Sequence, residues 1–174
     1  MIAIVTASIA ALTVAIAGML TPGYDPMTRT ISRLASPGMP YAGAVAFAIV
    51  LVALSCFALA AALTYQSARL RAALVVAACA LLVTAAVHLD PASATATAIH
   101  RLASGVSALA LAISPALMKR PYPRPSLIVG MVEAGVLATA PVLVVTPFNA
   151  WGAWERMLLA LALAWLLLAA ATTR

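Results

Sequence analysis

Six apolar segments, each near the length of a bilayer crossing, fill almost all of this 174-residue chain. A hydrocarbon core of roughly 30 Å needs about 20 helical residues. Backbone amides cannot stay unpaired in lipid, and the segments are rich in Ala and Leu without strict alternation, which favours helices over barrel strands. The sequence therefore predicts an all-α, polytopic transmembrane bundle, with 1–174 as a single domain. The expected spans are about 2–20, 41–65, 72–88, 99–118, 127–146 and 157–172.

The number of spans and the fate of the first segment each allow an alternative. The third and sixth segments are short, so a bundle of five spans is the alternative. In the six-span interpretation, Trp151 and Trp154 extend the sixth segment. The first segment lacks a basic leader and a cleavage site, so we expect a retained helix rather than a signal peptide. Cys56 and Cys79 lie inside spans, where we expect small buried side chains rather than a disulfide.

The basic residues predict the orientation. One face of a six-span bundle carries six of them and no acid: Arg69, Arg71, Lys119, Arg120, Arg124 and Arg174. The opposite face carries Arg29, Arg33, Arg101 and Arg156, with the acids Asp25, Asp90 and Glu155. Lys and Arg are enriched on the cytoplasmic side. We therefore expect an inner (plasma) membrane protein with both termini in the cytoplasm.

The net charge of +6 does not indicate nucleic-acid binding. The basic residues are few and flank the membrane, and no nucleic-acid-binding motif accompanies them. Contact with anionic lipid headgroups explains them better. We expect membrane lipids as partners, together with other membrane subunits through helix packing. We expect no cofactor, because no nucleotide or haem-attachment motif is present.

The longest loop, Thr21–Pro40, is expected to contain a short interfacial helix. Pro-Gly turns bracket the loop, and Asp25 or Thr28 is placed to cap a helix that runs to Leu34. Arg29 and Arg33 then share one face, while apolar residues lie toward the membrane. The helix is interpreted either as an amphipathic connector or as a lid over a headgroup or substrate site.

Polar residues at the helix ends of this outer face form the candidate site. If those ends converge, the expected result is an ion-pair network between loops; the alternative is a headgroup pocket in which Arg binds phosphate. The candidates for lipid or headgroup contact are Asp25, Arg29, Arg33, Asp90, His100, Arg101, Glu155 and Arg156. His88, Asp90 and His100 are weak metal candidates, because neighbouring arginines oppose a cation and the spacing matches no zinc signature. No catalytic residue is assigned, since no GxSxG turn is present.

Glu133 stands apart as a carboxylate within the fifth span. An intramembrane acid suggests a functional site by default. We expect instead a structural hydrogen bond to Ser or Thr on a neighbouring helix; the alternatives are a cytoplasmic Arg partner, a proton-relay or transport role, and contact with a partner subunit. Pro115 and Pro141 are expected to kink the fourth and fifth spans.

Several short motifs resemble one known family. Tyr24-Asp25-Pro26 is followed by Ser32-x-Leu34, an Asp-Pro turn stands at Asp90, a His at position 100 opens the fourth span, and Gly152-x-x-x-Arg156 precedes the last. In this order they resemble the membrane-protein family catalogued as domain of unknown function 998. This chain has Val87-His88-Leu89-Asp90-Pro91 where many members carry Phe-Pro-x-Asp. The resemblance implies the six-span architecture and the outer polar cluster, and it names no reaction.

Three function classes follow. The favoured one is an accessory subunit of a larger envelope complex linked to lipid transport or handling, because the chain has almost no soluble mass and many small residues for helix packing. The first alternative is a stand-alone lipid-binding or transport protein that uses the outer Arg/Asp/His cluster. The second is an intramembrane enzyme acting on a lipid headgroup, and overall an enzymatic role is disfavoured.

Overall fold

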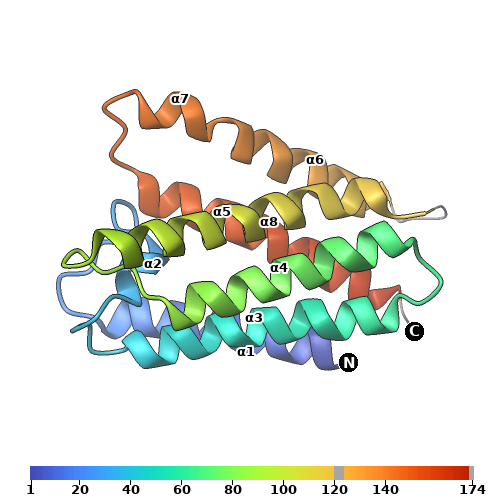
Figure 1. The fold of residues 1–174 in the computed structure, drawn as a ribbon, viewed down its shortest axis with the longest axis horizontal. Coiled ribbons are helices and arrows are strands. Elements are labelled where there is room, and N and C mark those ends of the chain that lie inside the picture. Colours follow the sequence, from blue (N-terminus) through green and yellow to red (C-terminus); the bar gives the residue numbers. More distant parts are fainter. Residues whose placement is uncertain (120–123, 173–174) are drawn as a thin grey trace.

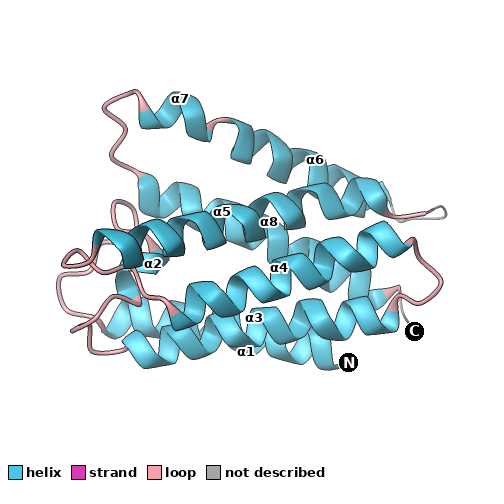
Figure 2. Ribbon diagram, viewed as in Figure 1, coloured by secondary structure: helices cyan, strands magenta, loops and turns pink. Residues whose placement is uncertain are grey.

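The computed structural model describes residues 1–119 and 124–172, and every regular element within them is a helix (Figure 2). Six helices are long and apolar enough to cross a membrane, and they run side by side (Figure 1). Their bounds are α1 Ile2–Leu20, α3 Ala42–Ala62, α4 Ala68–Ala86, α5 Ala94–Leu117, α6 Arg124–Ala138 continued by α7 Ala140–Val144, and α8 Trp151–Ala171. The predicted all-α, six-span bundle is confirmed.

The helix bounds coincide with the predicted limits for α1 and differ from them for the other helices. Helices α4 and α5 begin earlier than expected, because Ser67 and Ser93 cap them by accepting hydrogen bonds from Leu70 N and Ala96 N. Their first turns carry polar and charged residues, which a hydropathy pattern leaves out of the span. The sixth span likewise begins at Trp151, ahead of a charged pair.

The two prolines affect the helices differently. Pro141 follows an interruption at Thr139 that separates α6 from α7, close to the position where a kink in the fifth span was predicted. Pro115 lies near the C-terminal end of α5 and packs against Gly130 of α6. A side chain at position 130 would overlap the Pro115 ring, so glycine permits this close approach of two helices.

The long helices pack in chain order around a ring, which α8 closes by contacting both α6 and α1. The start of α1 and the end of α8 lie at the same end of the bundle (Figure 1). The main apolar core fills this end, around Trp165, Leu59 and Leu74. The opposite end, which we call the cluster end, carries loops 21–41, 87–93 and 145–150.

The short helix α2, Ile31–Leu34, lies at the cluster end and differs from its prediction. It is one turn long, and Thr30 caps it rather than Asp25 or Thr28. Its apolar side faces the protein rather than the membrane, since Ile31 and Leu34 are buried against α1 and α3. Arg29 precedes the helix, so it does not share a helical face with Arg33.

Candidate functional site

The first loop is fixed to the start of α8. Ala153 N donates to Met27 O at 2.9 Å. At the neighbouring Gly152, an added Cβ would collide with the carbonyl oxygens of Pro26 and Arg29. Only a residue without a side chain lets the loop backbone lie this close to the helix.

Arg156, one turn after Gly152, binds the same loop through its guanidinium. Its Nη1 donates to Pro26 O at 2.6 Å and to Arg29 O at 3.0 Å, and its Nη2 donates to the Tyr24 hydroxyl at 2.5 Å. The Arg156 guanidinium carbon also lies 5.4 Å from the Tyr24 ring centroid, within cation–π range. Burial raises the pKa of Tyr24. Arg156 thus binds carbonyl oxygens of the first loop, whereas an ion pair with a carboxylate had been expected.

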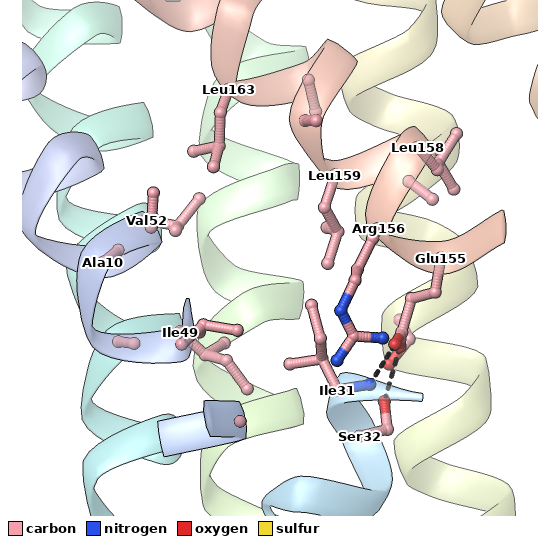
Figure 3. Close-up of a pocket in the computed structure, with 18 of the residues that line it drawn as sticks. Ala10, Ile31, Ser32, Ile49, Val52, Glu155, Arg156, Leu158, Leu159 and Leu163 are labelled. Atoms are coloured by element: carbon pink, nitrogen blue, oxygen red, sulfur yellow. Dashed lines mark hydrogen bonds between the residues drawn. The ribbon is translucent and has the colours of Figure 1, made fainter. Parts of the chain in front are cut away.

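Three further polar side chains form a hydrogen-bonded chain beside it. Glu155 accepts from Ile31 N and, at 3.1 Å, from the Ser32 hydroxyl (Figure 3). The Ser32 oxygen lies 3.0 Å from His100 Nε2, and His100 Nδ1 lies 2.7 Å from Val87 O. The chain thus joins the first loop, α5 and α8, and His100 is only 1% exposed.

Counting hydrogens shows what this chain requires. A carbonyl only accepts, so His100 Nδ1 carries the hydrogen that faces Val87 O. The single hydroxyl hydrogen of Ser32 cannot serve both His100 Nε2 and a Glu155 carboxylate. All three groups bond fully only with one additional proton, on His100 Nε2 or on Glu155. These two arrangements use the same heavy-atom positions and differ by a proton shift through Ser32.

The other outer acids have local roles. Asp25 accepts from Met27 N at 2.9 Å and from the Thr28 hydroxyl at 2.7 Å, which lowers its pKa. Asp90 accepts from Ala92 N at 2.8 Å. Among the described residues these acids and Glu155 bond to N–H and O–H groups and form no ion pair, so the expected ion-pair network between loops is wrong. The three loops are joined by hydrogen bonds instead.

The remaining candidates are not drawn into the cluster. Arg29, Arg33 and Arg101 are exposed. In the part of the chain that the structure describes, no group of three His, Cys, Asp or Glu residues is placed to hold a metal. His88 and Asp90 therefore do not join His100 as ligands.

A cavity of about 1050 Å³ extends from this cluster into the bundle. Its walls are mostly apolar and come from α1, α3, α4, α5, α6 and α8, with Ile49, Val52 and Leu163 among them (Figure 3). Tyr24, Ser32, Glu155 and Arg156 line its polar part. Met19 also lines the cavity and is 85% exposed, so the cavity is open beside the end of α1.

Glu133 lines the same cavity from α6 and is fully buried. Neither carboxylate oxygen has a hydrogen-bond partner among the described residues. The expected structural hydrogen bond to a neighbouring Ser or Thr, and the alternative Arg partner, are therefore wrong within this part of the chain. The rotation of α6 places Glu133 on the buried face of that helix, where no described Ser or Thr lies within hydrogen-bond distance of the carboxylate.

Residue-by-residue reasoning missed Tyr24 and Ser32 as members of the site. The signal was present in the short motifs of the sequence, since Tyr24, Ser32, His100, Gly152 and Arg156 all belong to those motifs and all meet at the cluster end. Val87 takes part only through its backbone, which leaves no sequence signal.

The chain was compared with protein-family models, curated proteins and solved structures. A family model described as Protein of unknown function (DUF998) matches residues 4–172. No curated protein and no solved structure matches the chain. Because the match covers nearly the whole chain, the protein belongs to the DUF998 family.

Proposed function

We propose that this protein binds an amphiphilic membrane lipid, with the lipid's apolar chain in the cavity and its polar end at the cluster of Tyr24, Ser32, Glu155 and Arg156. The observation that carries the proposal is the cavity itself. Its volume of about 1050 Å³ lies at the upper end of the roughly 300–1,000 Å³ of ligand pockets. Apolar walls with a few convergent polar groups suit a ligand of mixed character.

Arg156 supports the placement of the polar end. Nη1 of Arg156 donates to carbonyl oxygens of the first loop, and Nη2 donates to the Tyr24 hydroxyl. A guanidinium has five N–H groups. Nε–H and one Nη2–H have no partner among the described residues. These two donors suit a phosphate, carboxylate or ester oxygen.

The α2 turn supports the role of a cover over this site. Ile31 and Ser32 line the cavity, and the loop that carries them is held to α8 by Gly152, Arg156 and Glu155. This favours the lid interpretation of the first loop over a simple connector.

The accessory-subunit and headgroup-enzyme classes stay predictions. Apolar outer faces suit lipid as well as a partner helix, so they do not favour a subunit. The contact between Ser32 Oγ and His100 Nε2 resembles a nucleophile and its base, but Glu155 competes for the same hydroxyl.

The proposed setting is the inner membrane with both termini in the cytoplasm, on the basis of the basic residues near Ser67. A cysteine introduced at Ser67 is expected to resist an impermeant thiol reagent in intact cells. Cys79 is exposed on the helix surface, so Cys79→Ser is included in the parent chain. Labelling at position 67 in unbroken cells would reverse the orientation.

Co-purified lipid tests the binding proposal. Gly105 lines the cavity and Gly135 does not, and neither has an atom within 4 Å of an added Cβ. In mild detergent, Gly105→Trp is expected to retain several-fold less bound lipid than the wild type, whereas Gly135→Trp retains the wild-type amount. Equal lipid in the two variants would contradict the proposal. Mass spectrometry of proteins in the same preparations tests the accessory-subunit prediction.

A further inference from the structure

Glu133 belongs to an unusual stripe on α6. The buried residues of this helix are Ser126, Gly130 and Glu133, which share one face, whereas Met131 and Val132 point outward. The contact of Gly130 with Pro115 fixes the rotation of α6 against α5. Glu133, one turn further along, is therefore held facing the interior.

Among the described residues, the interior gives this carboxyl group no hydrogen-bond partner. Besides Thr21, Tyr24 and Ser32 at the cluster end, three hydroxyls line the same cavity, on Thr84, Ser104 and Ser107. Thr84 donates to Ala80 O at 3.0 Å and Ser107 donates to Ser104 O at 2.8 Å, so their helices already hold them. Arg156, the basic residue in the lining, binds the first loop. A buried polar group without a partner is rare and asks for an explanation.

The position of Glu133 in the cavity follows from a contact between α6 and α8. Trp154 Nε1 donates to Val136 O at 3.2 Å, which places Val136 level with the cluster end of α8. Glu133 precedes Val136 by three residues, or roughly 4.5 Å along the helix at 1.5 Å per residue. It therefore lies about one turn deeper in the cavity than the polar cluster.

We propose that Glu133 is a second polar contact for the cavity's occupant, and that the occupant carries a hydrogen-bond donor, a hydroxyl or an amine, about one helical turn below its polar end. The proposal rests on the proposed lipid binding and narrows its ligand class. Glu133 is 0% exposed and turned into the cavity, so a partner subunit does not reach it from the lipid side. A neutral acid pairs with a hydroxyl and a carboxylate pairs with an ammonium, and both contacts would satisfy the orphaned oxygens.

The test uses the full-length chain in detergent and three probes at equal mole fraction, each a tetradecyl phosphate whose fourth carbon carries a hydroxyl, an amino or a methoxy group; they are called the alcohol, the amine and the ether. The alcohol and its methyl ether differ by the donor. Native mass spectrometry measures the bound fraction of each. In the wild type, the alcohol or the amine is expected to bind about tenfold or more tightly than the ether, whereas Glu133→Leu binds all three alike. Val132→Leu, an exposed neighbour on α6, is the control and keeps the wild-type ratio.

Glu133→Gln separates the two donors. Retained preference for the alcohol over the ether identifies a hydroxyl ligand, and loss of a preference for the amine identifies a cationic one; either result supports the proposal. Thermal unfolding of each variant without probe shows whether the variant is folded. Glu133→Leu is expected to be at least as stable as the wild type, because it removes an unpaired buried carboxyl group. A large loss of stability would reveal an internal partner and overturn the proposal.

The two proposals fail in different ways. If the wild type binds the ether as tightly as the alcohol and the amine, lipid binding in the cavity stands and the donor contact at Glu133 is wrong. If none of the three probes binds, both proposals are wrong.

Discussion

Replacing Gly152 with alanine tests whether the docked first loop holds the cluster end together. The new Cβ would overlap the carbonyl oxygens of Pro26 and Arg29, both of which are backbone atoms that cannot rotate aside. The loop must move away from α8. This movement strains the hydrogen bond from Ala153 N to Met27 O and the bonds from Arg156 to the loop.

The expected cost follows from these contacts. Overpacking costs about 1–3 kcal/mol, and one weakened hydrogen bond costs about 0.5–1.5 kcal/mol. Together they give on the order of 2–4 kcal/mol. At about 2–4 °C per kcal/mol for a chain of this size, Gly152→Ala lowers the Tm by roughly 5–15 °C.

Gly135→Ala is the matched control for this measurement. It also places alanine in a helix, but an added Cβ there meets nothing within 4 Å. Alanine is favoured over glycine by about 0.5–1 kcal/mol in a helix, so this variant is expected to equal or exceed the wild type in Tm. The assay is thermal unfolding of both purified variants in the same detergent. Equal Tm values for Gly152→Ala and Gly135→Ala would refute the role assigned to the loop contact.

Two further predictions concern the polar cluster. Burial raises the pKa of Tyr24 above its ordinary value of 10.0, so the stability that the neutral hydroxyl contributes is present below pH 10 and is lost as the pH rises through the folded pKa. Tyr24→Phe should therefore show a smaller fall in Tm above pH 10, and an unchanged fall would contradict this. Ser32→Ala leaves Nε2 of buried His100 without its hydroxyl partner and should cost about 1–3 kcal/mol. Glu155→Gln, whose amide supplies the additional hydrogen, should keep a near-normal Tm; a Gln variant as unstable as Ser32→Ala would show that the hydrogen count is wrong.

The sequence predicted the helices far better than it predicted the contacts between them. Hydropathy located every span, because an apolar helix in lipid is decided locally. It missed the first turns of α4 and α5, where serine caps precede polar residues. It predicted ion pairs for the outer acids, because charge is visible in a sequence. Glu155 instead binds the backbone N–H of Ile31, a group of a kind that every non-proline residue carries.

For Glu133, the sequence predicted a candidate site but not the surroundings of the side chain. Its place within a span marked it as a candidate, and the structure keeps it as one. That it has no hydrogen-bond partner among residues 1–119 and 124–172 depends on the contact between Gly130 and Pro115, which sets the rotation of α6. No spacing rule in a single sequence reports such a rotation.

The link between the first loop and the last helix also constrains how the protein is made. Ser32 and Glu155 are separated by 123 positions in the chain. At about 5–20 residues per second, a ribosome needs roughly 6–25 s to add the segment between them. For that interval the first loop is synthesised but has no helix to dock on. The polar cluster is therefore completed after the other spans have been made, and a chain that stops before α8 has five spans but no site.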